Sequence, residues 1–251
     1  MKTIGHWING EHVSSTTART SPVFNPATGV EQAQLQLATP EQVNDVVAAA
    51  KLAFVSWGIS SLSQRAKILF AFREIMNRRV NDLALAITDE HGKVLSDAAG
   101  EVQRGLEVVE YACGLPTLLK GEYSDQVSGG VDLFSYRQPL GVVAGITPFN
   151  FPAMVPMWMF PIAIATGNTF ILKPSERDPS ASLLMAEMWK EAGLPDGVFN
   201  VIQGDADVVN ALLDHPDVKA ISFVGSTPIA RYIHGRAIGV EPTNEIALTS
   251  G

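Results

Sequence analysis

Residues 142–150 read Val142-Val143-Ala144-Gly145-Ile146-Thr147-Pro148-Phe149-Asn150, a short apolar run followed by a turn. Three more short apolar runs follow, at residues 169–172, 199–202 and 220–224, and a helical segment comes after each run. Such alternation predicts parallel strands joined by crossover helices. The sequence therefore indicates an α/β fold with a doubly wound parallel sheet.

Polar residues follow each of the four runs. They are Thr147–Asn150, Lys173–Arg177, Gly204-Asp205 and Gly225–Thr227. Because ligands of doubly wound sheets bind at the carboxyl ends of the strands, the pattern predicts one site along one edge of the sheet. The chain has neither a Gly-x-Gly-x-x-Gly fingerprint nor a Gly-Lys-Ser/Thr loop, so any phosphate would have to be held in another way.

Asn150 lies within a run without charged residues, which extends from Gln138 to Leu172. A buried amide without a hydrogen-bond partner costs roughly 1–3 kcal/mol, so we expect this side chain to be satisfied by backbone or held ready for a ligand. The run contains five prolines and two asparagines, which argues against a helix that spans a membrane.

The N-terminal part combines hairpins with helices. An Asn-Gly pair within residues 7–13 and a turn cluster at residues 24–29 predict two hairpins, and Thr39-Pro40-Glu41-Gln42 predicts a capped helix start. We expect further helices after Ser63, from Asn81 to Gly92, and from Ser96-Asp97 to Gly114. Residues 123–137 suggest a strand pair that leaves the main body.

Composition limits the classes of function. The 251 residues carry a net charge of −8, and no cluster of Lys or Arg suits nucleic acid. A single cysteine excludes an internal disulfide, and the five histidines show no metal-ligand spacing, so no metal site is expected. Charged residues make up only 18%, which suggests that apolar surface meets a partner. The N-terminus has no secretory signal, so we expect a cytoplasmic location.

Three motifs together resemble the aldehyde dehydrogenase superfamily. They are residues 147–152 (Thr-Pro-Phe-Asn-Phe-Pro), 173–176 (Lys-Pro-Ser-Glu) and 223–227 (Phe-Val-Gly-Ser-Thr), and the resemblance extends from about Trp7 to His234. Residues 148–154, 103–106 and 173–177 look most like the CoA-acylating methylmalonate-semialdehyde dehydrogenase branch. This resemblance implies a Rossmann-like NAD-binding domain, with NAD as cofactor, CoA as co-substrate and a small semialdehyde as substrate.

The resemblance also implies roles for individual residues. Asn150 matches the residue whose amide stabilises the oxyanion, and Arg104 matches the clamp for the substrate carboxylate. Lys173 and Glu176 match residues that hold the ribose hydroxyls, a pairing that favours NAD over NADP. The other matched cofactor-binding positions are Thr147, Phe149, Arg177 and Ser226, the last beside the pyrophosphate at a helix N-terminus.

In the family, the nucleophilic cysteine belongs to a second domain, and no residue of this sequence matches it. We therefore expect residues 1–234 to form an incomplete NAD-binding domain, with residues 123–137 as oligomerisation strands of an incomplete homo-oligomer interface. Residues 235–251 look like a poorly ordered tail outside the family pattern. The catalytic domain would be absent, and the chain would be a truncated homologue that is inactive alone.

Other readings remain open at the level of sequence. The chain could be a non-catalytic module that binds dinucleotide or pairs with a longer relative, or an unstable gene remnant with an exposed sheet edge. Asn150 and residues 173–176 could be ordinary turns, and Arg104 could be a surface residue. We expect Cys113 to be a small buried apolar residue rather than a substitute nucleophile.

Overall fold

The computed structural model describes residues 2–14, 19–239 and 245–248. Its centre is a seven-stranded sheet with the order β12-β11-β8-β9-β10-β2-β3. From β12 to β10 all neighbouring strands are parallel, and β2 and β3 extend the sheet with antiparallel pairs. The strands are β2 (His6–Ile8), β3 (Glu11–Val13), β8 (Val142–Ile146), β9 (Thr169–Lys173), β10 (Phe199–Val201), β11 (Val218–Phe223) and β12 (Glu245–Leu248).

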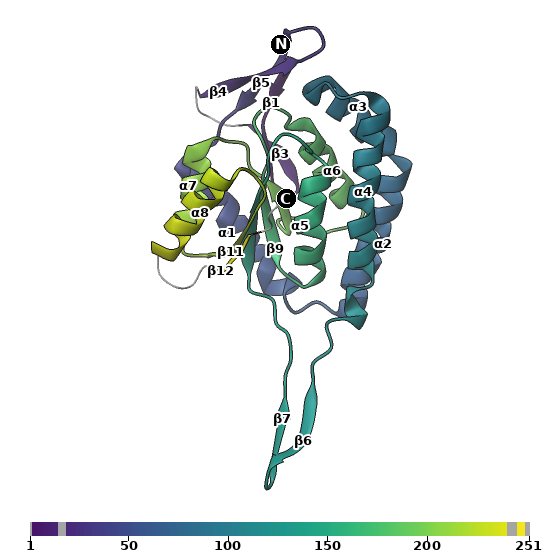
Figure 1. Cartoon of the computed structure of the whole chain (residues 1–251), viewed down its shortest axis with the longest axis vertical. Coiled ribbons are helices and arrows are strands. Elements are labelled where there is room, and N and C mark those ends of the chain that lie inside the picture. The colour runs from purple at the N-terminus through teal and green to yellow at the C-terminus, as the bar shows by residue number, and fades with distance from the viewer. Residues whose placement is uncertain (1, 15–18, 240–244, 249–251) are drawn as a thin grey trace.

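Helices cover both faces of this sheet (Figure 1), as the predicted doubly wound α/β fold requires. Phe170 and Leu172 of β9 belong to the larger core cluster, whereas Ile171 between them belongs to the other cluster on the opposite face. The first face is packed by α2 (Leu62–Arg78), α3 (Val80–His91), α4 (Leu95–Cys113), α5 (Met154–Ala165) and α6 (Ser180–Glu191); the second by α1 (Pro40–Trp57), α7 (Ala206–Asp214) and α8 (Thr227–Gly239).

Both predicted N-terminal hairpins are present. Asn9 and Gly10 join β2 to β3 with φ angles of 52° and 78°, the left-handed conformation that an Asn-Gly turn provides. The second turn joins β4 (Thr20–Asn25) to β5 (Val30–Gln36), and β1 (Lys2–Ile4) pairs in parallel with β5 to complete a small three-stranded sheet.

The predicted helix start agrees with the structure where a side chain close in the sequence caps the helix. Thr39 accepts from the backbone N–H of Gln42, and the Gln42 side chain returns to the Thr39 N–H, which confirms the predicted capping box. The predicted starts of α2, α3 and α4 differ from the observed starts by one or two residues. Ser61 caps α2, whereas α3 and α4 begin without a side-chain cap, so no local motif marked their starts.

The predicted strand pair at residues 123–137 is β6 (Tyr123–Ser128) and β7 (Val131–Phe134). Figure 1 shows this hairpin extending away from the main body as an arm. Every residue of both strands is exposed, including the apolar Val131, Leu133 and Phe134. The arm therefore has little contact with the core.

The C-terminal part differs from the expectation of a poorly ordered tail that begins at residue 235. Helix α8 continues to Gly239, with Ile233 and Ala237 buried four residues apart on one face. Strand β12 then pairs in parallel with β11. The rest of the expected tail, residues 240–244 and 249–251, lies outside the described residues. No helix of the described chain is both long and apolar enough to cross a membrane.

Candidate functional site at the strand ends

The loops that carry the predicted site residues meet at one edge of the sheet. Strand β8 lies between β9 and β11, with Ile146 level with Lys173 on one side and with Phe223 on the other. The chain proceeds from β8 to β9 and β10 on one side and then crosses to β11 on the other. A topological switch point therefore lies between β8 and β11, where sheets of this type bind ligands.

Two backbone hydrogen bonds fix this edge. The Thr147 N–H donates to the Lys173 carbonyl at 3.2 Å, and the Val224 N–H donates to the Ile146 carbonyl at 3.2 Å. Ser226 is exposed directly before α8, and its carbonyl accepts the Ala230 N–H at 2.9 Å, as the residue that opens a helix does. The first free N–H groups of α8 are thus available to an anion.

Phe149 and Arg177 come from different loops and contact each other. The Arg177 guanidinium carbon lies 4.7 Å from the centroid of the Phe149 ring, and the His91 ring stacks at 6.3 Å. Phe149 is nevertheless 44% exposed. Thr147 is buried, and its hydroxyl oxygen has no hydrogen-bond partner among the described residues.

Lys173 and Glu176 form the most polar part of this edge. The Lys173 ammonium is buried and lies 3.6 Å from the Glu176 carboxylate, which is 39% exposed. Burial lowers the pKa of Lys173, and the charge of Glu176 offsets part of that shift. A donor and an acceptor stand side by side here, an arrangement that suits two adjacent hydroxyl groups.

Asn150 is exposed, so the prediction of a buried amide in an apolar setting was wrong. The uncharged run around it is buried in β8, α5 and β9, but Asn150 itself lies in the loop between β8 and α5. Its backbone carbonyl accepts from the Lys93 ammonium at 3.0 Å. No described residue bonds to its side-chain amide, which is therefore accessible to a ligand.

Arg104 lies on α4 beside the same loop. Its Nε donates to the Met154 sulfur at 3.3 Å, and its guanidinium carbon lies 5.8 Å from the Phe151 ring. Gly105 follows it, and a Cβ there would lie 2.2 Å from the Met157 methyl group, so glycine permits the close packing of α4 on α5. The structure thus brings Arg104 near the Asn150 loop, while its exposed head group stays accessible.

Sequence reasoning missed two charged residues beside this loop, one buried and one half-buried. Glu101 is fully buried on α4, and Lys93 lies just before that helix with its side chain 11% exposed. Glu101 occurs on the apolar face of α4 together with Ala98, Val102 and Gly105. A carboxylate on such a face is a signal that could have identified it.

Asp178, which sequence reasoning also missed, is buried between β9 and α6. Neither of its carboxylate oxygens has a hydrogen-bond partner among the described residues. Burial, together with the negative charges of Glu90 and Glu101, raises the pKa of Asp178 to about 8, and the nearby Ser175 hydroxyl and Lys93 offset only part of this rise.

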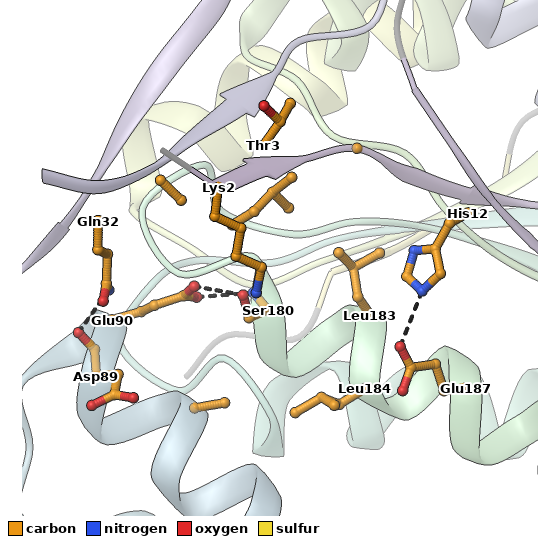
Figure 2. A pocket seen from close by; sticks show the side chains of 14 residues that line it. Lys2, Thr3, His12, Gln32, Asp89, Glu90, Ser180, Leu183, Leu184 and Glu187 are labelled. Carbon is orange, nitrogen blue, oxygen red and sulfur yellow. Dashed lines mark hydrogen bonds and ion pairs between the residues drawn. The ribbon is translucent and has the colours of Figure 1, made fainter.

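The remaining candidates do not extend the site. Burial raises the pKa of the Cys113 thiol to about 11, as expected of a structural cysteine and not of a nucleophile. No cluster of His, Cys, Asp and Glu in the described parts of the chain could hold a metal ion. A cavity of about 420 Å³ lies elsewhere, between the N-terminal strands, α3 and α6 (Figure 2), and none of the predicted site residues lines it.

Comparison with known proteins identifies the family of this chain. Residues 12–249 match the aldehyde dehydrogenase family, including residues 235–249, where a tail outside the family pattern was predicted. Malonate-semialdehyde dehydrogenase of Pseudomonas aeruginosa is 54% identical over 93% of this chain and 47% of its own length. Malonate-semialdehyde dehydrogenase 1 of Geobacillus thermodenitrificans is 51% identical over 94% of this chain and 49% of its own.

Solved structures show the same relationship. Methylmalonate-semialdehyde dehydrogenase of Oceanimonas doudoroffii matches with a TM-score of 0.96 and 52% identity, over 100% of this chain and 51% of its own. A Sinorhizobium meliloti protein assigned the same activity was solved in complex with NAD. It matches with a TM-score of 0.97 and 47% identity, over 100% of this chain and 51% of its own. The chain spans about half the length of these relatives. It belongs to the aldehyde dehydrogenase family and has the fold of the family's NAD-binding domain.

Proposed function

We propose that this chain supplies the NAD-binding part of a CoA-acylating malonate- or methylmalonate-semialdehyde dehydrogenase. The observation that carries the proposal is the convergence of the loops after β8, β9 and β11 at one switch point. The reaction would oxidise the aldehyde, transfer the acyl group to CoA and release one carbon as carbon dioxide, giving acetyl-CoA or propionyl-CoA. The relatives named for these substrates support this choice.

The proposed cofactor site uses the groups that the strand ends present. Lys173 would donate to one ribose hydroxyl and Glu176 would accept from the other, while the charge of Glu176 disfavours an additional phosphate. Ser226 and the N-terminus of α8 would face the pyrophosphate. Thr147, Phe149 and Arg177 would complete the walls of the site.

The proposed chemistry assigns two further groups to the substrate. Bound NAD would accept the hydride from the substrate. The accessible Asn150 amide would donate to the oxyanion that forms on the aldehyde carbon, and donors of this kind contribute roughly 3 kcal/mol in other enzymes. Arg104 would hold the carboxylate of the semialdehyde with its exposed guanidinium.

The nucleophile is proposed to lie in the part of the relatives' length that this chain does not span. Cys113 is unsuitable because it is buried and its pKa is raised. We therefore expect no steady formation of NADH when the purified chain is mixed with semialdehyde, NAD and CoA. NADH formation is measured by its absorbance. Steady turnover would contradict the proposal that the nucleophile lies outside this chain, whereas NAD binding without turnover would support it.

The exposed arm suggests how copies associate. We propose that the β6–β7 hairpin packs against another copy or a longer relative, because its apolar residues are exposed along both strands. A location in the cytoplasm is also proposed, since a single free thiol suits a reducing compartment.

A further inference from the structure

Lys93 and Glu101 form a buried ion pair directly behind the Asn150 loop. The Lys93 ammonium lies 2.6 Å from Glu101 Oε2, and the exposed fractions of the two side chains are 11% and 0%. The Lys93 ammonium also lies 4.4 Å from the centroid of the Phe151 ring. Because the Glu101 carboxylate is fully buried, its charge is costly unless its remaining hydrogen-bonding capacity is satisfied.

Both side chains also form hydrogen bonds with the backbone of the loop. Glu101 Oε1 accepts the N–H of Ala153 at 2.9 Å and of Met154 at 3.2 Å. Lys93 donates to the carbonyl of Asn150 at 3.0 Å. Helix α5 has no side-chain cap of its own, so the Glu101 carboxylate from α4 serves as its N-terminal acceptor and complements the helix dipole.

We propose that Lys93 and Glu101 are positioning residues for Asn150, which we call the Lys93–Glu101 clamp. The clamp holds the backbone at residue 150 on one side and at residues 153 and 154 on the other, so only Phe151 and Pro152 lie between the two fixed points. The position of the Asn150 backbone, and with it the direction of the Cα–Cβ bond, is thereby set before a ligand arrives. The catalytic importance of that direction rests on the oxyanion role proposed above for Asn150.

The clamp is tested in the full 251-residue chain with three variants, Lys93→Met, Glu101→Gln and the combination of both. The readouts are the side-chain amide NMR signal of Asn150, assigned by its loss in Asn150→Ala, and the hydrogen-exchange rates of the Ala153 and Met154 amides. The thermal midpoint is measured in parallel. Arg73→Met combined with Glu110→Gln is the matched control, because it removes a different ion pair of α4 that does not contact the loop.

Lys93→Met is expected to lower the thermal midpoint, since it leaves a buried carboxylate without its countercharge. The combined variant removes both charges and should recover most of this loss. It should still show a shifted or broadened Asn150 signal and at least about tenfold faster exchange at Ala153 and Met154, because the uncharged Gln oxygen is a weaker acceptor than the carboxylate that it replaces. The control should leave the Asn150 signal and both exchange rates unchanged.

A combined variant that regains the wild-type midpoint with an unchanged Asn150 signal would overturn the proposal and leave the pair a purely structural role. Should Lys93→Met fail to fold, the combined variant still decides the question. A parallel NAD titration of the wild-type chain separates the two claims. Absence of NAD binding would count against the proposed function, whereas the Asn150 signal tests the clamp without any ligand.

Discussion

At the scale of single residues, burial shifts the pKa of several ionisable side chains away from the ordinary value. Asp178 is buried near Glu90 and Glu101, whose negative charges add to the effect of burial and raise its pKa, and burial also raises the pKa of Glu90. Lys173 shows the opposite response, a lowered pKa, because burial disfavours its positive charge. These three groups lie in or beside the loop between β9 and α6, or pack against it. The electrostatics of this region therefore depend on few side chains.

Asp178 should make the chain less stable as the pH rises. Its pKa is about 8 when folded and near 4 when unfolded, so folding takes up a proton between these values and stability falls across that window. Asp178→Asn removes this loss and should increase the free energy of unfolding at pH 8 by on the order of 2–3 kcal/mol, with little gain at pH 4.

Urea denaturation of Asp178→Asn at pH 4, 6 and 8 measures the effect. Asp45→Asn on the exposed side of α1 is the control and should follow the wild type at each pH. Equal gains from Asp178→Asn at pH 4 and pH 8 would contradict the assigned pKa.

Glu176 should determine the choice between NAD and NADP. Glu176→Gln keeps the size of the side chain and removes the charge that repels a ribose phosphate, so the ratio of NADP to NAD affinity should rise by about tenfold. Calorimetric titration with both dinucleotides measures this ratio, and Glu107→Gln on the exposed face of α4 provides a control. An unchanged ratio would place Glu176 away from the ribose.

At the scale of elements, a helix start can be predicted from the sequence when the residue that caps it is a neighbour in the sequence. The start of α1 follows from four consecutive residues, because Thr39 and Gln42 cap each other. In contrast, α5 is capped by Glu101 and α6 by Glu90, whose carboxylate accepts the Ser180 N–H at 2.9 Å from 90 residues away. Sequence spacing contains no information on such distant pairs. Lys93 and Glu101 were missed for another reason: their bonds reach the backbone of residues 150, 153 and 154, about 50 residues further along the chain. Lys173 and Glu176 were assigned through the family resemblance.

The capping box of α1 yields a direct prediction of stability. Thr39→Ala should lower the free energy of unfolding by about 1 kcal/mol, because the N–H of Gln42 loses its acceptor. Thr39→Ser retains the hydroxyl and should stay within about 0.5 kcal/mol of the wild type. Chemical denaturation of the three proteins measures the difference, and equal stability of the alanine and serine variants would show that the cap does not contribute.

At the scale of the whole molecule, the four parallel strands and their order along the chain followed from short apolar runs with helical segments between them. The edge position of β2 and β3 did not follow, because antiparallel pairing of β2 with β10 joins segments nearly 200 residues apart. Asn150 illustrates the same limit for a site. Its loop was located correctly, but its exposure depends on packing that an uncharged stretch of sequence cannot reveal.

The projecting hairpin should govern self-association. Leu133 and Phe134 are 60% and 67% exposed, so replacing both with serine should shift the chain toward monomer without lowering the thermal midpoint. Leu52→Ser with Val55→Ser removes two apolar groups of α1 that are 76% and 68% exposed, and serves as the control. Light scattering after size exclusion measures the mass; a wild-type monomer, or association that persists in the hairpin variant, would exclude the hairpin as an interface.

The central claim is that the strand ends of this chain form a dinucleotide site. Calorimetric titration of the folded 251-residue protein with NAD tests it most directly, together with Lys173→Met, which removes the buried donor beside Glu176. We predict saturable binding of one NAD per chain and at least about tenfold weaker binding by the variant, since a hydrogen bond from a charged group is lost. Absence of saturable binding by a wild-type chain that unfolds cooperatively, or equal affinity of the two proteins, would contradict the account.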